Sequence, residues 1–600
     1  MESKFNKTDK YSIRNWKISQ IINSKDIVIP EIQRPFVWNA TKVRDLLDSL
    51  YQGYPIGYVV TWLNHDVQLK GGGVSKGETI IIDGQQRIKA LQAALLGHDI
   101  TDSNYETRKI KIAFHPIEAR FEVQNSAILK DKKWLPDISE VIRSSSSYSL
   151  VKNYLKLNPD VDEATAVEGI ERLDKIPEKT IGLIELSAGL EIETITEIFI
   201  RINSAGTALS QADFVMSKIV SNKKYKGSEL GKAIDYFCHL AEEPDFYKNI
   251  VKDKEFTETD FFRKIQWLKD EKDDLYNPKY TDLLRVAFTS QFNRGDLSDL
   301  VSLLSGRNFE TRSYEDTIAE QSFATLKKGV LNFVNESNFN RFLMFIKSAG
   351  FIAPQLIQTQ NALNFAYIVY LKLKELKYAE ADIGKYVCRW FVYTILTGHF
   401  SRGAESSFDK DIRHISTKPF DQLLKEHEDA TLSDTYWNTT LVQNLDTSVA
   451  NSPLFRVFLA AQVKANTKGF LSDRDIVRNL IENRSDIHHL FPRDYLKKNG
   501  FERTDYNQIA NYACTQAEIN RAIGNSPPQE YFELVRKQMQ TPSKKERICG
   551  ISSEEELQEN LKENCIPKEI TNMDFKNYKE FLALRRKLMA EKIKEYYFSL

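Results

Sequence analysis

The hydrophobic and polar positions of the first 220 residues alternate between the spacing of strands and the spacing of helices. A helix is predicted between Asn39, which can cap it, and Gly53, which can end it, because apolar residues at helical spacing lie between them. This part of the chain should therefore have a mixed α and β fold. Strands are predicted at residues 26–29, 56–62, 79–82, 109–114 and 181–186.

From about residue 225 the pattern becomes mainly helical and stays so to about residue 470. Amphipathic stretches at 361–375 and 383–396 are typical of this part. The rest of the chain returns to short elements and ends with a helix over 578–597, which is rich in apolar and basic residues. We therefore predict an α+β multidomain chain with a mainly helical middle, divided at 1–222, 223–465 and 466–600.

The composition limits the classes of partner and compartment. The chain has 83 Lys and Arg against 83 Asp and Glu, so a surface that binds nucleic acid must be a local patch. The five cysteines contain no Cys-x-x-Cys pair, which argues against a zinc ribbon or a disulfide framework and favours a reducing compartment. No apolar signal segment or membrane-spanning stretch is visible. We therefore expect a cytoplasmic protein without a membrane partner.

The first candidate site lies where a β-branched run ends at Asp83-Gly84 and is followed by Gln85, Gln86 and Arg87. This order predicts a tight turn at the end of a strand and a helix N-terminus directly after it. A helix N-terminus attracts anions, Arg87 can bind two phosphate oxygens at once, and Asp83 could hold a metal or orient a water. The alternative is an ordinary strand-turn-helix whose arginine forms a surface salt bridge.

The second candidate site is a pair of adjacent histidines, His488 and His489, followed by Asn511 and Asn520. Adjacent histidines are unusual in a chain that has only nine. The elements predicted around them are a helix from a cap at Ser472 and Asp475 to about Asn483, a strand over 486–491, a helix over 493–498 that ends at Gly500, and a helix from a capping box at 515–518 to about Gly524. The other histidines show no ligand spacing and are expected to be ordinary: His65, His98, His115, His239, His399, His414 and His427.

Further segments around the first site carry a family resemblance. Residues 29–38 read IPEIQRPFVW, residues 53–57 read GYPIG, and residues 199–210 read FIRINSAGTALS. With the DGQQR turn, and over about residues 10 to 220, they resemble the N-terminal domain of GmrSD-type modification-dependent restriction proteins, whose fold is similar to ParB and sulfiredoxin. The resemblance implies a domain that binds and hydrolyses a nucleoside triphosphate, with GTP, UTP, CTP and ATP not distinguished.

The same resemblance assigns residues. It implies a nucleotide pocket lined by Gln33, Arg34, Asp83, Gly84, Gln85, Gln86 and Arg87. Arg201, Asn203, Gly206 and Thr207 form a second family-like turn whose role stays open. A structural explanation of that turn is also available, because glycine can adopt a positive φ at Gly206 and Ser210 with Asp213 can form a capping box.

The order of two histidines and two asparagines resembles the HNH, or ββα-metal, nuclease fold, in particular the C-terminal domain of the same family, including SspE-like relatives. The resemblance implies that His489 is the general base, that His488 and Asn520 are ligands of a divalent metal, Mg²⁺ or Mn²⁺, and that Asn511 fixes the loop. His488 departs from the acidic residue usual at its position, and imidazole suits softer ions than Mg²⁺, so Asp486 is an alternative ligand. Simple packing of the histidine pair is the structural alternative.

These observations predict a nucleotide-dependent DNA endonuclease of antiphage defence that senses modified phage DNA. Two other functions stay open: a nucleotide-switched DNA-binding regulator with an inactive nuclease domain, and a toxin-like nuclease that senses no modification. Basic clusters at 544–547 and 585–587 could contact the DNA backbone, or be solvated surface. The segment at 401–411 also resembles the family, without an assigned chemistry. A homo-oligomer is an open possibility.

Overall fold

The structure, a computed structural model, divides into two compact units that are described separately. Unit 1 comprises Met1–Tyr236, Asp245–Phe261 and Leu297–Ala324, and unit 2 comprises Phe237–Pro244, Phe262–Asp296 and Thr325–Leu600. The predicted division into three domains stays a prediction. The residues that the structure describes are 10–24, 27–28, 38–63, 79–101, 107–143, 147–187, 190, 194, 198, 211–222, 224–271, 275–483, 487–540 and 547–600.

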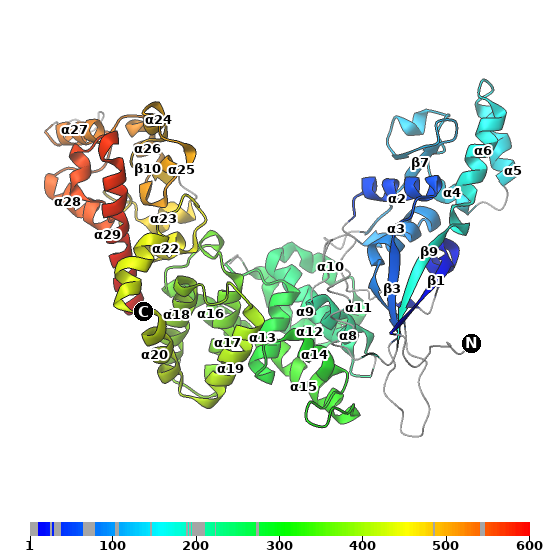
Figure 1. Ribbon diagram of the computed structural model, residues 1–600, viewed down its shortest axis with the longest axis horizontal. Coiled ribbons are helices and arrows are strands. Elements are labelled where there is room, and N and C mark those ends of the chain that lie inside the picture. Colours follow the sequence, from blue (N-terminus) through cyan, green and yellow to red (C-terminus); the bar gives the residue numbers. More distant parts are fainter. Residues whose placement is uncertain are drawn as a thin grey trace. The chain divides into compact units, whose positions relative to one another are not determined.

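Unit 1 is built on a five-stranded sheet with the order β1-β9-β3-β4-β2. Figure 1 labels three of its strands, β1, β3 and β9. β1 and β9 are antiparallel, β9 and β3 are parallel, β3 and β4 are antiparallel, and β4 and β2 are parallel. Four of the five strands coincide with predicted runs, and β1 was not predicted. The strands are β1 Tyr11–Lys17, β2 Ile27–Val28, β3 Tyr58–Leu63, β4 Thr79–Asp83 and β9 Thr180–Leu186.

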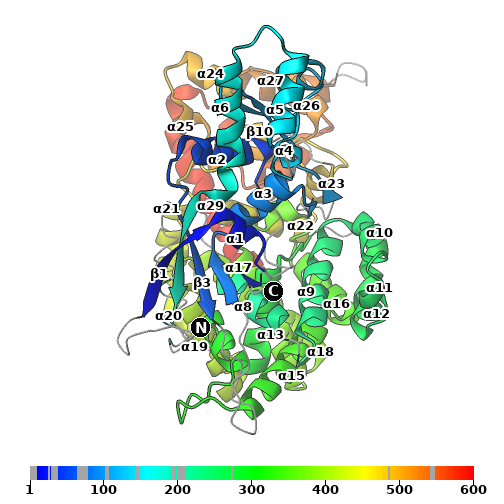
Figure 2. The same ribbon diagram turned by 90° about the vertical axis from the view of Figure 1, so that its right-hand side faces the viewer.

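The missing prediction at β1 has a physical reason. β1 lies at the edge of the sheet, as Figure 2 also shows, and most of its side chains are exposed or half-buried. Tyr11 and Ile13 are more than half exposed. An edge strand of this kind lacks the alternation of buried and exposed residues by which a strand is recognised in a sequence.

Helices cover the face of the sheet that carries Val59 and Leu183, which are buried in the core of unit 1. The best-predicted of these helices is α2, Ala40–Gln52: the Asn39 side chain accepts a hydrogen bond from the Lys42 amide at 2.9 Å, and Gly53 ends the helix with φ +79°. Its apolar face packs into the same core. The other helices here are α1 Ile18–Ile22 and α3 Gln85–Leu96.

The remaining strands of unit 1 form two small antiparallel pairs, in which β7 coincides with part of the run predicted at 109–114. The prediction began three residues too early. These strands are β5 Ile100–Thr101, β6 Thr107–Arg108, β7 Ile112–His115 and β8 Arg120–Val123. The other helices of unit 1 are α4 Ile138–Ile142, α5 Ser147–Leu157, α6 Glu163–Asp174, α8 Gln211–Ser221, α10 Tyr247–Ile250, α11 Lys254–Thr257 and α14 Leu297–Leu304. Three more helices contain residues of both units: α9 Gly227–Glu242, α12 Asp260–Ile265 and α15 Asp316–Phe333.

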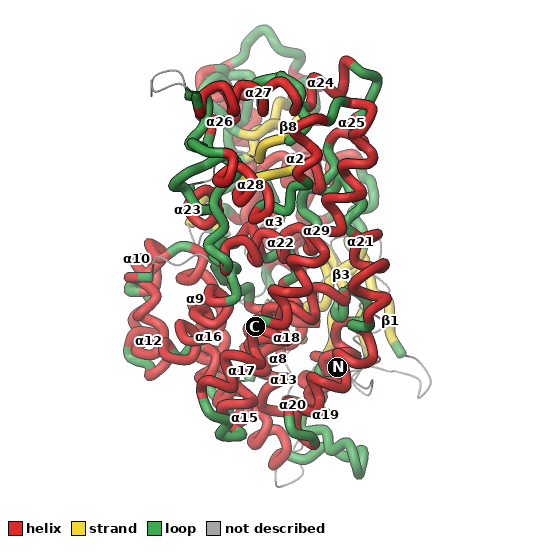
Figure 3. Tube along the Cα trace, turned by 90° about the vertical axis from the view of Figure 1, so that its left-hand side faces the viewer, coloured by secondary structure: helices red, strands yellow, loops and turns green. Residues whose placement is uncertain are grey.

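Unit 2 is mainly helical, and its helices are among the red segments of Figure 3, whose labelled strands, β1, β3 and β8, belong to unit 1. The helical middle is confirmed, and the two clearest predicted helices are α17 and α18, whose inward faces are almost fully buried. The helices up to the histidine site are α13 Tyr280–Phe292, α16 Glu336–Ser348, α17 Gln360–Glu375, α18 Glu380–Thr397, α19 Ala404–Thr417, α20 Phe420–Thr431, α21 Leu441–Asn444 and α22 Pro453–Lys464.

The C-terminal part of unit 2 alternates short helices with one two-stranded sheet. The predictions for α24 and for the last helix are confirmed. The elements are α23 Val477–Glu482, β10 Ile487–His489, α24 Arg493–Lys498, α25 Arg503–Tyr506, β11 Tyr512–Cys514, α26 Ala517–Ile523, α27 Pro528–Met539, α28 Glu554–Glu563 and α29 Tyr578–Phe598. Within the described ranges, no helix is both long enough and apolar enough to cross a membrane.

Two predicted helix caps are wrong. Ser472 accepts a hydrogen bond from the Asp475 amide within a turn, and α23 begins later without a side-chain cap. The hydroxyl of Thr515 donates to the Phe470 carbonyl at 2.6 Å instead of capping α26. At Ser472 the expected local bond forms but closes a turn, and the helix begins two residues after Asp475. At Thr515 a carbonyl distant in the sequence takes the hydroxyl.

Candidate functional site

The two histidines lie on β10, which pairs with β11 so that His488 is opposite Ala513 and His489 is opposite Tyr512. Neighbouring side chains of a strand point to opposite faces, so the two imidazoles leave β10 in opposite directions. The strand predicted over 486–491 is shorter than expected, and Asp486 lies outside the described residues. α26 follows β11, which gives the chain order strand, strand, helix.

His488 is brought into direct contact with Asn520, although 32 positions separate them in the sequence. Nδ1 of the imidazole lies 2.7 Å from Oδ1 of Asn520, which projects from α26. Phe470 stacks against the ring at 5.7 Å with an interplanar angle of 13°. The two residues predicted as metal ligands are therefore adjacent in the fold.

Burial determines the charge of His488. Its side chain is 2% exposed, and this loss of hydration lowers its pKa to about 4, against the opposing effect of the hydrogen bond to Asn520. The positive charge of Arg585 also favours the neutral ring. Nε2 is buried and has no hydrogen-bond partner among the residues described. His488 is thus neutral at pH 7, which is the form that can bind a metal.

The contact between His488 and Asn520 is a hydrogen bond in which the amide oxygen accepts, so Nδ1 of His488 carries the imidazole proton. A cation held by Nδ1 and Oδ1 would replace this hydrogen bond and would need the proton on Nε2 instead. Two ligand atoms that each lie about 2.1 Å from an ion, at about a right angle, are about 3 Å apart. The observed separation of 2.7 Å is close to this value. In the part of the chain that the structure describes, no group of three or more His, Cys, Asp and Glu side chains could hold a metal. A metal here would have one imidazole and one amide oxygen as ligands, completed by water and phosphate.

His489 is half-buried and lies in a different environment on the other face of β10. Its Nε2 is 3.2 Å from Oδ1 of Asn507, and Tyr512 packs edge-on against the ring at 5.0 Å. An amide oxygen accepts a hydrogen bond, so Nε2 carries the proton and Nδ1 is the atom that can accept one. Burial lowers the pKa of His489, with Asn507 opposing this and Arg493 adding to it.

Asn507 is a site residue that the sequence analysis missed. It ends the short helix α25 and lies 18 positions after His489, where no motif or spacing marks it. The sequence shows only that an asparagine lies between the histidine pair and Asn511. Asparagine is too common for this position alone to indicate a role in the site. Asn507 lies next to the candidate base His489 only because the chain folds back on itself.

Asn511 holds the turn that follows the histidines. It is fully buried, its Oδ1 accepts from the Phe491 amide at 2.8 Å, and its Nδ2 donates to the carbonyls of Phe491 and Tyr506 at 3.0 and 3.1 Å. Its backbone carbonyl accepts from the Leu490 amide at 2.8 Å. These bonds fix the backbone directly after His489, which is the structural part of the role implied for Asn511.

Arg585 supports the same region from α29. Its side chain is 1% exposed and donates to the carbonyls of Ala510 and Asn564, at 2.8 and 3.4 Å. Burial lowers its pKa to about 10. The prediction that the cluster at 585–587 could contact DNA or be solvated surface is therefore wrong for Arg585. Residues 544–546 of the other basic cluster lie outside the described residues.

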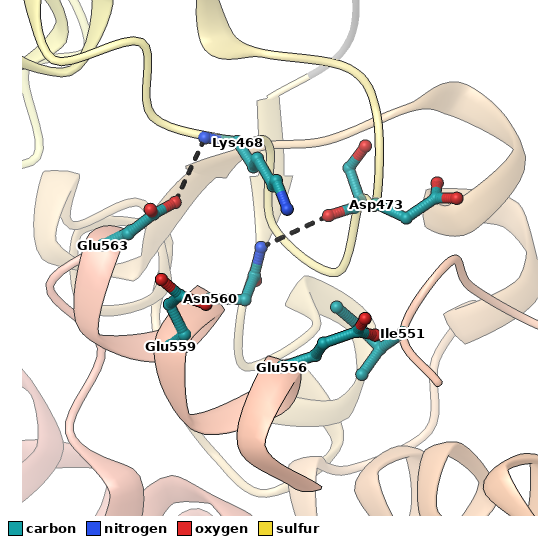
Figure 4. Close-up of a pocket in the computed structure, with 8 residues that line it drawn as sticks. Lys468, Asp473, Ile551, Glu556, Glu559, Asn560 and Glu563 are labelled. Carbon is teal, nitrogen blue, oxygen red and sulfur yellow. Dashed lines mark hydrogen bonds between the residues drawn. The ribbon is translucent and has the colours of Figure 1, made fainter. Parts of the chain in front are cut away.

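The loop that carries Phe470 is held by Asn560 of α28, at the edge of a small acidic pocket (Figure 4). Oδ1 of Asn560 accepts from the Leu471 amide at 2.9 Å, and Nδ2 donates to the carbonyls of Gly469 at 2.9 Å and Ser472 at 3.5 Å. Because this loop places Phe470 against the imidazole of His488, Asn560 supports the histidine site without touching it.

The first candidate site has the predicted strand-turn-helix geometry. β4 ends at Asp83, α3 begins at Gln85, and Gly84 between them has φ +98°. A Cβ at Gly84 would lie 2.9 Å from a methyl group of Val59, so both the conformation and the space require glycine. Nη1 of Arg87 donates to the Tyr58 carbonyl at 2.6 Å. The candidate residues Gln33 and Arg34, and the second family-like turn from Arg201 to Ser210, lie outside the described residues.

The structure also gathers two histidines that show no ligand spacing. Nε2 of His399 lies 2.7 Å from one carboxylate oxygen of Asp411, and Nε2 of His427 lies 4.0 Å from the other. Asp411, which belongs to the segment at 401–411, is fully buried. This cluster joins the end of α18 to α19 and α20, and its contacts explain its residues as structural.

Comparison with known proteins relates the N-terminal part of the chain to a nuclease family. Residues 18–220 match the family model of the GmrSD restriction endonuclease, N-terminal domain, which confirms the resemblance predicted for this region. An uncharacterized protein of Methanocaldococcus jannaschii is 21% identical over 626 residues, which cover 95% of this chain and 96% of that protein. The first match supports a restriction-type nuclease that has DNA as its partner.

Proposed function

We propose that this chain is a DNA endonuclease of antiphage defence that cuts modified phage DNA at the site formed by β10, β11 and α26. The observation that carries the proposal is the 2.7 Å contact between His488 and Asn520. Two polar residues so far apart in the sequence meet at a strand that carries a second histidine on its other face, in a chain whose residues 18–220 match a restriction endonuclease family.

His489 would act as the general base. Hydrolysis of a phosphodiester requires a group that removes a proton from the attacking water, and the proton would pass to Nδ1 of His489. The bond from Nε2 to Asn507 keeps the ring in the tautomer that this transfer needs. Burial lowers the pKa of His489, which keeps the imidazole unprotonated at pH 7.

His488 and Asn520 would hold a divalent cation, Mg²⁺ or Mn²⁺, which when bound stabilises the charge that develops on the scissile phosphate. The neutral state of His488 is required for this role, and binding through Nδ1 would also move the ring proton to Nε2, which has no hydrogen-bond partner among the residues described. An imidazole ligand favours Mn²⁺ over Mg²⁺. Phe470 stacks on the His488 ring, and Asn511 fixes the backbone of Phe491 after the histidine pair.

We propose that the N-terminal turn binds and hydrolyses a nucleoside triphosphate that regulates cleavage. The amides at the start of α3 converge on the end of β4, where a phosphate would be favoured by the helix N-terminus and by Arg87. Gln33, Arg34 and residues Asp83 to Arg87 would line this pocket. GTP, UTP, CTP and ATP are candidates for the nucleotide.

A nucleotide-switched DNA-binding regulator with an inactive nuclease domain is the second candidate. It is favoured by the described part of the histidine site, which contains no carboxylate among its candidate metal ligands. Such a protein would bind DNA in a nucleotide-dependent manner and would leave it intact with either metal.

The test is digestion of modified and unmodified phage DNA with Mg²⁺ or Mn²⁺, with and without each nucleotide. Selective cleavage of modified DNA, lost in His489→Ala, is the expected result. Equal cleavage of both DNAs would favour a toxin-like nuclease that senses no modification. Nucleotide-dependent binding without cleavage would favour the regulator.

A further inference from the structure

A polar pocket of about 370 Å³ lies in the helical part of unit 2, between α15, α16 and α17. It is separate from both candidate sites. Its polar lining consists of two lysines, three asparagines and one glutamate: Lys328, Asn332, Asn335, Asn338, Lys374 and Glu375. A pocket with so many hydrogen-bonding groups selects its ligand by the atoms that remain unpaired.

Each oxygen of the pocket's carboxylate is already paired with a lysine. One oxygen of Glu375 accepts from Nζ of Lys328 at 3.2 Å, and the other accepts from Nζ of Lys372 at 3.1 Å. Burial opposes ionisation of Glu375, but the two lysines outweigh it and hold its pKa below the ordinary value. The glutamate is therefore ionised and has both oxygens occupied, so it does not make the pocket a cation site.

Two of the three amide oxygens are also occupied. Oδ1 of Asn335 accepts from the Asn338 amide at 3.0 Å and caps α16. Oδ1 of Asn338 accepts from Nζ of Lys374 at 2.6 Å, and its Nδ2 donates to the Asn332 carbonyl at 2.9 Å. The amide nitrogen of Asn335 and the further N–H groups of the lysines remain as donors.

The charges favour the same kind of ligand. The pocket lining carries two positive charges, on Lys328 and Lys374, and one negative charge, on Glu375, which is also paired with Lys372 outside the lining. Within the described residues, Lys374 has no acidic partner and contacts only the neutral Asn338. The pocket therefore offers donors and positive charge, which together suit an anion with several oxygens, such as phosphate. In a chain with no net charge, this is a local basic patch of the kind that DNA binding requires.

We propose that this pocket binds a phosphate group of the DNA backbone and so holds the substrate of the nuclease, an inference that rests on the proposed function for its ligand. Phosphate contacts of this kind position a protein on DNA and carry no sequence information. The same chemistry would bind a free mononucleotide, and the experiment separates the two sources.

The experiment measures binding of the full-length chain to a short unmodified DNA duplex, without metal, over a range of salt concentrations. Lys374→Gln removes the charge but keeps an N–H donor for Asn338. Loss of one phosphate contact should reduce the slope of log K against log salt by about 0.9 and weaken binding equally for different sequences. Lys385→Gln, an exposed lysine on α18, is the matched control and should leave the slope unchanged.

A second arm measures binding of inorganic phosphate and of a mononucleotide to the same variants. Weaker mononucleotide binding in Lys374→Gln, with an unchanged slope for DNA, would overturn DNA as the ligand. An unchanged slope with unchanged small-anion binding, or no DNA binding by the wild type, would overturn the proposal. Cleavage is assayed separately: a wild type that binds DNA through Lys374 but cuts nothing would refute the nuclease and leave the pocket standing.

Discussion

The candidate site at the turn between β4 and α3 is built from consecutive residues, whereas the candidate site at the hairpin of β10 and β11 is built from residues that are distant in the sequence. In the first, five consecutive residues form the group, and Gly84 is required by the local backbone. In the second, the residues that meet come from the hairpin, from α26 and from the end of α25. A local motif can be recognised in a sequence together with its geometry, whereas an assembled site shows only some of its members.

The two regions also differ in how deeply their candidate side chains are buried. At the hairpin, loss of hydration lowers the pKa of both histidines. Buried supports such as Asn511 and Arg585 surround it. At the turn, Asp83 and Arg87 are only partly buried, and Arg87 bonds a backbone carbonyl. Substitutions should therefore affect function alone at the turn, and both function and folding at the hairpin.

The largest effect is expected at the turn. Asp83→Ala or Arg87→Ala should abolish nucleotide hydrolysis, because the first removes the carboxylate at the strand end and the second removes the phosphate-binding fork. The unfolding free energy should change little, since neither side chain is fully buried. Nucleotide turnover and thermal unfolding are measured, with Lys89→Ala of the same helix as the control. Undiminished turnover in both variants would remove the nucleotide site from this turn.

His489→Ala should slow DNA cleavage by about 10²- to 10⁴-fold, the usual contribution of a general base. DNA and metal binding should persist, because neither depends on this imidazole in the proposed mechanism. Nucleotide hydrolysis at the turn should be unaffected. Asn507→Ala should reduce the cleavage rate by less, because it leaves the base present but unsupported. Wild-type cleavage by His489→Ala would be incompatible with this assignment.

His488→Ala should weaken metal affinity by more than the roughly 10- to 100-fold that follows from loss of a residue that only supports a ligand. Cleavage should partly recover at high Mn²⁺ concentration, and the defect of His489→Ala should not. Titration of cleavage against Mn²⁺ in both variants distinguishes the two roles. If Mn²⁺ restored cleavage equally in both variants, or in neither, the assignment of His488 as metal ligand and His489 as general base would be wrong.

The smallest effect is on stability. Asn511→Ala should lower the unfolding free energy by about 1–3 kcal/mol, because the buried Phe491 amide and two carbonyls lose their partner. Urea denaturation measures the change. Nucleotide hydrolysis serves as the internal control, since the turn lies in the other compact unit. A fully stable variant would mean that the bonds of Asn511 are replaced by water.

Elements with strong local signals could be predicted from the sequence. α2 is predicted with both of its ends because Asn39 and Gly53 act on their own backbone. The turn at Gly84 is predicted for the same reason. β1 could not be predicted, because an exposed edge strand leaves no alternating pattern. The cap expected at Thr515 fails because a distant carbonyl, that of Phe470, takes its hydroxyl.

The candidate sites divide in the same way. His488, Asn511 and Asn520 could be named from their order in the chain; the structure brings His488 into contact with Asn520, and Asn511 bonds the backbone of Phe491, two residues after His489. Asn507, Phe470 and the burial of Arg585 could not, because each depends on which distant segments pack against the hairpin. The cluster of His399, Asp411 and His427 likewise follows from helix packing and has no spacing signature.

The adjacency of His488 and His489 makes the site unusually sensitive to strand register. A slip of one residue in β10 would move every side chain to the opposite face of the strand. If His489 came opposite Ala513, the proposed base would face Asn520, and His488 would move opposite Cys514, away from Asn520. A deletion or insertion of a single residue just before β10 should thus separate His488 from Asn520 without removing any member of the site. The bond from the Leu490 amide to the Asn511 carbonyl opposes such a slip.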